Sequence, residues 1–262
     1  MQLGFIGTGN ITTALVEGLC AAGISDLHIL LSPRNAVKAS RLAAMFRQAE
    51  IAENNQAVIR GCDTVILALR PQVALPVLRE LQFQPEQKII SLIADTPLAV
   101  IKDIAAPAEN VCRAAPLPSV AKRNGPILIY PEHAFANDIL SRVGRLFPVV
   151  DEKELELLWT LTALISPYYA LLETTSNWAA AAGLDEQTAQ NYTAAMFCAL
   201  SQQALDAAEK KFSDLVEEAA TPGGLNEQAL QVIRSKGAYN AFRTALDSIA
   251  ARLGVNPAGP KE

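Results

Sequence analysis

The sequence has few residues of the kinds that bind metal ions. Histidine occurs only twice, as His28 and His133, in unrelated segments. The four cysteines are far apart and form no Cys-x-x-Cys pair. This spacing matches no metal-ligand pattern, so we expect no metal site. Scattered, unpaired cysteines also predict a reduced, cytoplasmic protein.

Charge of one sign and long apolar runs are also scarce. Charged residues make up 19% of the chain, the net charge is −5, and no basic stripe is present, which argues against binding of nucleic acid. The most apolar run, residues 157–172, is shorter than the ~20 residues that span a bilayer. It also contains polar residues and Pro167, so we expect a buried helix and no membrane span. The N-terminus lacks the basic region of a secretory signal.

What the sequence does contain, at its start, is a glycine-rich turn between an apolar run and an amphipathic segment. Gly7 and Gly9 suit a tight turn that lets the backbone approach a pyrophosphate. A helix from Asn10 to Ala22 would direct its N-terminal N–H groups at that anion. The third glycine position of the usual G-x-G-x-x-G pattern is Thr12. The predicted phosphate-binding residues are Gly7, Thr8, Gly9, Asn10 and Ile11; the alternative is a strand-turn-helix without a ligand.

The chain divides into two parts by its hydrophobic patterns. Strands and helices alternate over residues 1–150, with near-continuous apolar strands at 63–69 and 88–93. Residues 151–262 show helices only, with Asp185 as an N-cap, a break at Pro167, and an alanine-rich apolar stripe through 192–208. We therefore predict an α/β fold in which a Rossmann-type dinucleotide-binding domain (1–150) precedes an all-helical dimerisation and substrate domain (151–262). The predicted strands are 2–6, 27–31, 63–69, 88–93, 111–115, 126–130 and 147–150, and the predicted helices of the first domain are 10–22, 35–47, 72–81, 97–105 and 134–146.

The segment after the second strand predicts NADPH as the cofactor. NAD-binding folds place a carboxylate there for the ribose 2′-hydroxyl, and none follows Leu31. Ser32, Arg34 and Asn35 can instead bind a 2′-phosphate, Arg34 with two parallel hydrogen bonds. The alternative is that Arg34 is a solvated residue of a helix first turn. A second predicted contact is the segment after strand 63–69, and the alternative is a structural loop; its residues are Ala68, Leu69, Arg70 and Pro71.

Taken together, four motifs resemble the pyrroline-5-carboxylate reductase family over essentially the whole chain. They are the N-terminal glycine loop, Ser32-Pro33-Arg34, Ala68-Leu69-Arg70-Pro71-Gln72 and Thr221-Pro222-Gly223-Gly224. The resemblance implies an NADPH-dependent enzyme that reduces the C=N bond of 1-pyrroline-5-carboxylate to give proline. It also implies an interlocked homodimer, or a higher homo-oligomer, with each active site between a sheet domain and helices that include the partner's.

The substrate half departs from the family pattern. The family's lysine before Pro71 is Arg70, and its Met-Pro-Asn-Thr-Pro motif is Ala115-Pro116-Leu117-Pro118-Ser119. Its Gly-Ser-Gly-Pro-Ala-Tyr loop corresponds to residues 164–169, without a glycine, and its substrate-side threonine aligns with Asn226. The candidate catalytic residues are Ser166, Tyr168, Thr221 and Asn226. The alternatives are that Tyr168 and Tyr169 are core aromatics and that residues 221–224 only link two helices.

Three functions fit these residues. The first is reduction of a cyclic imine, nominally pyrroline-5-carboxylate. The second is reduction of a different imine or keto compound on the same scaffold, and the third is dinucleotide binding without turnover. Hydride transfer needs little from protein side chains beyond positioning and a proton donor, so the altered substrate motifs alone do not decide among them.

Overall fold

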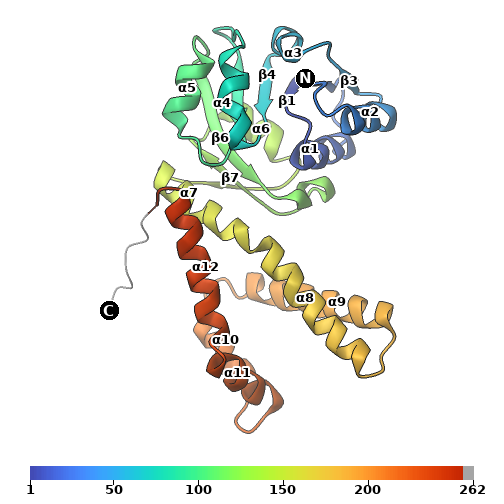
Figure 1. Cartoon of the computed structure of the whole chain (residues 1–262), viewed down its shortest axis with the longest axis vertical. Coiled ribbons are helices and arrows are strands. Elements are labelled where there is room, and N and C mark those ends of the chain that lie inside the picture. Colours follow the sequence, from blue (N-terminus) through green and yellow to red (C-terminus); the bar gives the residue numbers. More distant parts are fainter. Residues whose placement is uncertain (256–262) are drawn as a thin grey trace. The chain divides into compact units, whose positions relative to one another are not determined.

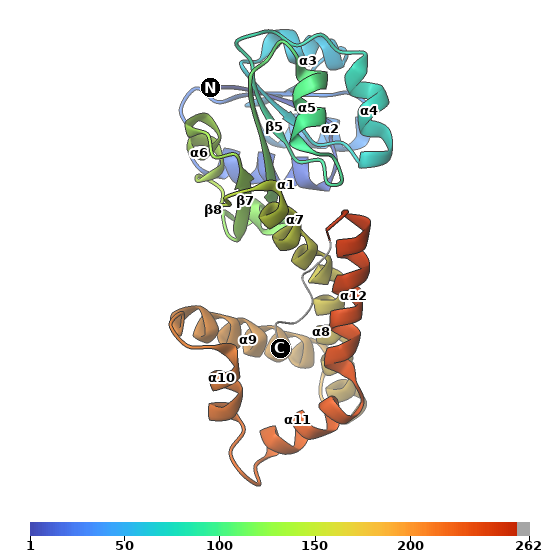
Figure 2. The same ribbon diagram turned by 90° about the vertical axis from the view of Figure 1, so that its left-hand side faces the viewer.

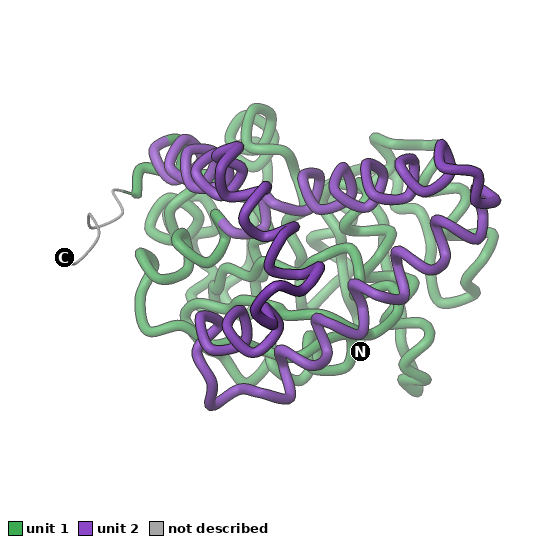
Figure 3. The backbone as a smooth tube through the Cα atoms, turned by 90° about the horizontal axis from the view of Figure 1, so that it is seen from below, with its two compact units in different colours: residues 1–160, 252–262 green, residues 161–251 purple. Residues whose placement is uncertain are grey.

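The structure, a computed structural model, describes residues 1–255 and divides them into two compact units. Of these residues, unit 1 contains 1–160 and 252–255, and unit 2 contains 161–251 (Figure 3). This division lies at residues 160/161, near the end of the first helix after the sheet. The sequence prediction placed the domain boundary before that helix. The predicted boundary at residues 150/151 stays a prediction.

Unit 1 is built on one eight-stranded sheet with the strand order β3-β2-β1-β4-β5-β6-β7-β8 (Figures 1 and 2). Strands β1 to β6 pair in parallel, β7 is antiparallel to β6, and β8 is parallel to β7. The order reverses between β1 and β4, which is the position where doubly wound sheets bind dinucleotides. The strands are β1 (Gln2–Ile6), β2 (His28–Leu31), β3 (Ala49–Ile51), β4 (Thr64–Leu67), β5 (Lys88–Ser91), β6 (Asn110–Pro116), β7 (Pro126–Tyr130) and β8 (Arg145–Pro148).

Helices cover both faces of this sheet, which explains why its central strands are continuously apolar. One buried cluster joins the sheet to α1 (Asn10–Ala21), α2 (Ala36–Met45), the 3₁₀ helix η1 (Pro118–Lys122) and α6 (Ala134–Leu140). A second cluster joins the other face to α3 (Asn55–Gly61), α4 (Pro71–Arg79) and α5 (Leu98–Ala105). A third, small cluster holds α7 (Glu152–Leu161) through Leu155, which packs on Ala115 and Leu128. The α/β prediction is confirmed.

Unit 2 is helical throughout, as predicted. It contains η2 (Thr162–Leu164), α8 (Ile165–Ala181), α9 (Glu186–Asp206), α10 (Phe212–Ala219), α11 (Leu225–Ser235) and α12 (Ala238–Arg252, whose last residue belongs to unit 1). Asp185 caps α9, accepting a hydrogen bond from the Thr188 backbone N–H at 2.9 Å. The three buried apolar clusters all lie in unit 1, and the large apolar side chains of unit 2 are mostly exposed within this chain.

Three local predictions were wrong. Pro167 does not break the helix: it lies in the first turn of α8, where a proline is tolerated. Helix α6 ends at Leu140 and not near 146, because β8 begins at Arg145 to extend the sheet. Residues 157–172 form helices, but Leu161, Tyr169 and Leu171 are exposed, because this chain has no second layer to cover them.

The same region contains the one helical run among residues 1–255 that is apolar and long enough to cross a membrane. It runs from Glu152 to Ala181, has a mean hydropathy of 1.3 in its most apolar window, and is 11% buried there. Only its length and composition meet this criterion. A helix that packs against another protein surface is apolar in the same way.

Candidate functional site

The glycine loop after β1 has the geometry of a phosphate-binding turn. Gly7 has a φ of +102°, and a Cβ there would lie 2.4 Å from the carbonyl oxygen of Ala68. Any other residue would therefore be strained and would collide with the β4 end. Gly9 is the N-cap of α1, and a Cβ there would meet nothing within 4 Å. The space in front of the helix N-terminus is thus open to an anion.

Thr12 stands where the usual pattern has its third glycine, and its hydroxyl has a definite partner. The Oγ1 atom donates a 2.6 Å hydrogen bond to the carbonyl oxygen of Gly7, and the side chain is completely buried. The hydroxyl binds a loop carbonyl instead of leaving room for close helix–strand packing. The departure from the glycine pattern therefore preserves the loop.

Ser32, which follows β2, forms hydrogen bonds with the same loop. Its Oγ accepts a 2.8 Å hydrogen bond from the Gly7 backbone N–H, and its carbonyl oxygen accepts one of 2.8 Å from the Thr8 hydroxyl. Ser32 is only 1% exposed. These contacts give it a structural role in the loop; its predicted contact with a 2′-phosphate stays a prediction.

A cleft of about 740 Å³ opens at the glycine loop. It is larger than another cleft of unit 1, whose volume is about 340 Å³. The larger cleft combines the loop with the start of α2 and the end of β4, as expected at the carboxyl ends of parallel strands. Its lining residues are Gly7, Thr8, Gly9, Arg34, Asn35, Ala36, Val37, Ala68, Leu69, Arg70, Gln72 and Val73.

Most of the predicted cofactor residues therefore line one cleft, although Asn10, Ile11, Ser32 and Pro71 are not among its lining residues. The sequence prediction missed Ala36, Val37, Gln72 and Val73. They belong to the first turns of α2 and α4, and the available signal was that these helices start directly after strands whose ends were already assigned to the site.

The cleft lining carries positive charge and no carboxylate. Arg34 and Arg70 line it, and Arg34 is exposed. Asn35 is the N-cap of α2, accepting a 3.3 Å hydrogen bond from the Lys38 backbone N–H. The ammonium group of Lys38 donates to Asn10 Oδ1 at the start of α1. An anionic ligand would be attracted by this group of cations and by the α1 N-terminus.

The four candidate catalytic residues all belong to unit 2, and all are exposed in this chain. Ser166 and Tyr168 lie in the first turn of α8, and Tyr168 packs edge-on against Phe197 of α9 with ring centroids 6.3 Å apart. Thr221 and Asn226 flank the turn before α11, where Asn226 Nδ2 donates to the carbonyl oxygen of Ala219 at 3.2 Å. Their catalytic roles stay predictions.

A cleft of about 500 Å³ lies between α10 and α11 and is lined partly by Pro222 and Glu227, but not by Thr221 or Asn226. Among residues 1–255, no group of three or more histidine, cysteine or acidic side chains is arranged to hold a metal ion. Burial raises the pKa of the Cys112 thiol to about 12 and that of Cys62 to about 11. Neither thiol is therefore a ready nucleophile.

Two family models match successive parts of the chain. Residues 2–95 match the model described as NADP oxidoreductase coenzyme F420-dependent, which covers the glycine loop and the cleft. Residues 156–254 match the model described as pyrroline-5-carboxylate reductase dimerisation, which covers the helical unit.

Curated relatives align over nearly the full chain. A pyrroline-5-carboxylate reductase from Pseudomonas aeruginosa is 25% identical over 261 residues, covering 96% of this chain and 95% of the relative. One from Vibrio alginolyticus is 24% identical, covering 96% of each.

Solved structures share the fold. The pyrroline-5-carboxylate reductase of Streptococcus pyogenes superposes with a TM-score of 0.83 at 19% identity, covering 97% of this chain and 98% of that one. That of Plasmodium falciparum, solved with NADP bound, gives 0.82 at 17% identity and covers 97% of each. The order of the two matched models, the full-length relatives and the shared fold agree with the motifs in the sequence: over its whole length the chain is similar to pyrroline-5-carboxylate reductases, which supports that family.

Proposed function

We propose that this protein is a cytoplasmic, homodimeric NADPH-dependent reductase that converts 1-pyrroline-5-carboxylate to proline. The observation that carries the cofactor assignment is the large cleft: an open helix N-terminus at Gly9, with Arg34 beside it and no carboxylate in the lining. The similarity to pyrroline-5-carboxylate reductases over the full chain supports the substrate.

In this proposal each part of the cleft has one task. The N–H groups at the start of α1 hold the pyrophosphate, and Arg34 pairs with the 2′-phosphate. When bound, NADPH supplies a hydride. Arg70, which follows β4, and Pro116, at the end of β6, lie on the side of the sheet where the nicotinamide is expected.

The reacting imine needs a proton as well as the hydride. A protonated imine accepts hydride at carbon, so one hydroxyl or water near the nitrogen is sufficient. Ser166, Tyr168, Thr221 and Asn226 are the groups proposed to bind and orient the substrate. Asn226 carries an amide where the family has a hydroxyl, so it would act by hydrogen bonding and not as an acid.

Two alternatives remain as outcomes of the same experiment. Tyr168 and Tyr169 put two aromatic rings, 5.7 Å apart, where the family has small residues or one tyrosine, which favours an imine of different shape. A protein that binds NADPH but turns over nothing is the third function.

The test is NADPH oxidation measured with pyrroline-5-carboxylate and, in parallel, with a panel of cyclic imines and 2-oxo acids. Proline is detected directly by chromatography. We expect stoichiometric formation of proline and oxidised cofactor. Turnover with another imine only would replace the substrate, and tight NADPH binding without turnover would indicate a binding protein.

The preference for NADPH is tested through Arg34. We expect NADPH to bind at least about tenfold tighter than NADH, because a charge-assisted contact contributes roughly 1.5–3 kcal/mol. Arg34→Ala should remove most of this difference in a fluorescence titration. Arg41→Ala is the matched control, since Arg41 lies on α2, the helix that follows Arg34, pairs with Glu17 at 3.7 Å and does not line the cleft. Equal affinities of the wild type for both nucleotides would refute the assignment.

The substrate turn is tested through Asn226. Asn226→Ala should lower kcat/KM for the imine by roughly tenfold or more while the Kd for NADPH stays unchanged, because the proposed contact is with substrate only. Tyr168→Ala should shift the ranking of imines more than the cofactor affinity. Unchanged kinetics in both variants, with an identified substrate, would leave residues 221–224 as a helix-linking turn.

A further inference from the structure

Arg113, in the middle of β6, is a completely buried arginine that the proposed chemistry does not use. Its position in the sheet is fixed by pairing with Ser91 of β5 and Tyr130 of β7. Its guanidinium carbon lies 5.3 Å from the ring centroid of Trp159 on α7. A buried cation persists only where partners compensate its lost hydration.

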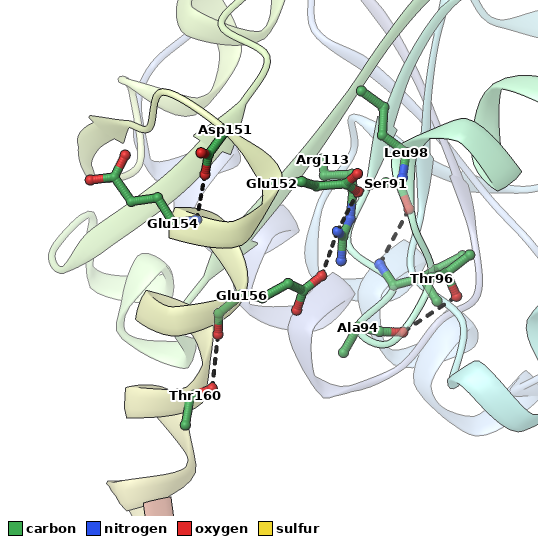
Figure 4. A network of polar contacts seen from close by, with 11 residues as sticks. Ser91, Ala94, Thr96, Leu98, Arg113, Asp151, Glu152, Glu154, Glu156 and Thr160 are labelled. Atoms are coloured by element: carbon green, nitrogen blue, oxygen red, sulfur yellow. Dashed lines mark hydrogen bonds and ion pairs between the residues drawn. The ribbon is translucent and has the colours of Figure 1, made fainter. Parts of the chain in front are cut away.

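The compensation comes from the first two turns of α7 (Figure 4). Arg113 Nη1 donates to Glu152 Oε1 at 2.7 Å and to Glu156 Oε1 at 2.5 Å. Among the described residues, Nε and Nη2 of Arg113 and Oε2 of Glu156 have no hydrogen-bond partner. One nitrogen of Arg113 therefore holds both carboxylates.

Glu152 links this ion pair to a third element. Its Oε1 also accepts a hydrogen bond from the Leu98 backbone N–H, at the first residue of α5. The loop that leads into α5 from β5 contains Asp95, which has a φ of 62° and pairs with Arg252 at 3.5 Å. Arg113, Glu152 and Leu98 thus join β6, α7 and the β5–α5 loop.

Two of these elements, the β5–α5 loop and β6, reach the carboxyl end of the parallel strands. The loop after β5 and the end of β6 both lie at the carboxyl ends of parallel strands, on the β4 side of the point where strand order reverses. A dinucleotide bound across that point extends its reactive end over this side and its 2′-phosphate end over the β2 side. Two residues beyond Arg113, Ala115 packs in the cluster that includes Leu155 of α7.

We propose that Arg113 is a positioning residue: through Glu152 it fixes the β5–α5 loop and the end of β6, the two segments beside the reactive end of the bound cofactor. The role in turnover rests on the proposed function; the positioning of the two segments does not. The carboxylate of Glu156 also pairs with Arg113, but it accepts no hydrogen bond from α5, so we expect substitution of the two glutamates to have different effects.

Hydrogen exchange of the protein without cofactor tests the positioning directly. Glu152→Ala should raise the exchange rates of amides in 94–98 and 115–119 at least about tenfold, because Leu98 N–H loses its acceptor and Arg113 loses one carboxylate. Glu156→Ala should leave 94–98 within threefold of the wild type. Amides of residues 7–13 should not change in either variant.

Arg113→Met should reproduce and exceed the Glu152→Ala pattern, with Arg113→Lys intermediate because an ammonium group is a single point charge. Arg142→Met is the control, since Arg142, just after α6, forms an exposed ion pair with Asp138 of α6 at 2.9 Å. If Arg113→Met does not fold, the two glutamate variants still decide the question. A uniform rise across the sheet, or equal patterns for Glu152→Ala and Glu156→Ala, would overturn the proposal.

Kinetics separate this proposal from the proposed function. With an identified imine substrate, Glu152→Ala should lower kcat at least about tenfold while the Kd for NADPH stays within threefold, because the 2′-phosphate end binds elsewhere. An unchanged kcat would overturn the role in turnover. Absence of wild-type turnover with every imine would refute the proposed function and leave the exchange result as the test of positioning.

Discussion

Two hydroxyl groups, those of Thr12 and Ser32, hold the phosphate loop in the shape that its glycines permit. Gly7 provides the positive φ, but it is the hydrogen bonds at 2.6 Å to its carbonyl and 2.8 Å from its N–H that fix both sides of its peptide units. Buried polar groups are nearly always hydrogen-bonded in this way. Each of these hydrogen bonds therefore fixes the position of the hydroxyl group as well as that of the loop.

A buried carboxyl group, Glu156, gives a prediction at the same scale. Burial raises its pKa, and Arg113 only partly offsets this effect. A carboxyl group whose pKa is higher in the folded than in the unfolded state binds more protons when folded. Its contribution to stability therefore falls as the pH rises from about 4.3 through the raised value.

We expect Glu156→Gln to flatten this part of the stability curve. The free energy of unfolding, measured with urea from pH 4 to pH 8, should decline less with rising pH in the variant than in the wild type. Glu17→Gln, which removes a surface carboxylate 3.7 Å from Arg41, should have a much smaller effect. A steeper decline in Glu156→Gln would show that the ion pair outweighs burial.

At the scale of elements, α1 packs closely against η1 on one face of the sheet. Gly18 of α1 faces Val120 of η1, and a Cβ on Gly18 would lie 2.1 Å from the Val120 carbonyl oxygen. A helix interior normally favours alanine over glycine by about 1 kcal/mol. The contact with η1 reverses that preference, because a backbone carbonyl cannot move aside as a side chain can.

Gly18→Ala should accordingly destabilise the protein by about 1–3 kcal/mol, the usual range for overpacking. Chemical denaturation monitored by circular dichroism measures this change. Gly61→Ala serves as the comparison, because its new Cβ would meet only the tip of the Leu30 side chain at 2.6 Å and should cost less. Equal losses in both variants would contradict the explanation.

The elements that the sequence predicts well are those whose patterns are local. The strands with continuous apolar residues and the Asp185 cap follow from residue order alone. The edge strand β3 and helix α3 were missed, because β3 has three residues and only one of them is buried. The side chain of Asn54, which accepts from the Ala57 backbone N–H at 2.8 Å, was the local signal for α3.

The candidate site divides in the same way. The lining of the large cleft was largely predictable, because strand ends and glycines determine it. The Arg113 network was not, because its partners are 39 and 43 residues away in the sequence. The environment of Tyr168 likewise depends on Phe197 in a different helix.

For the whole molecule, the dominant feature is a helical unit without a buried apolar core of its own. Trp178, Tyr192 and Leu205 are 74%, 70% and 66% exposed in this chain. Large apolar surfaces of this kind are found where subunits associate, and the matched dimerisation model covers the same residues. Association of copies supplies the apolar burial that one chain lacks.

We expect the wild type to sediment as a dimer or larger assembly at micromolar concentration. The double variant Tyr192→Glu with Leu200→Glu, on the exposed stripe of α9, should shift the population toward monomer and lower the helical signal. Val150→Glu, at a residue that is 85% exposed in unit 1, is the control and should leave sedimentation unchanged. A stable wild-type monomer would refute this prediction.

The return of the chain to unit 1 after α12 has a consequence for synthesis of the protein. Residues 252–255 belong to the sheet unit, where Arg252 pairs with Asp95 and Val255 is only 6% exposed. Domains usually fold as they leave the ribosome, beginning at the N-terminus. Here the sheet unit remains incomplete until the whole helical unit has been translated, so a premature stop near residue 250 would harm the sheet unit although most of it had been translated earlier.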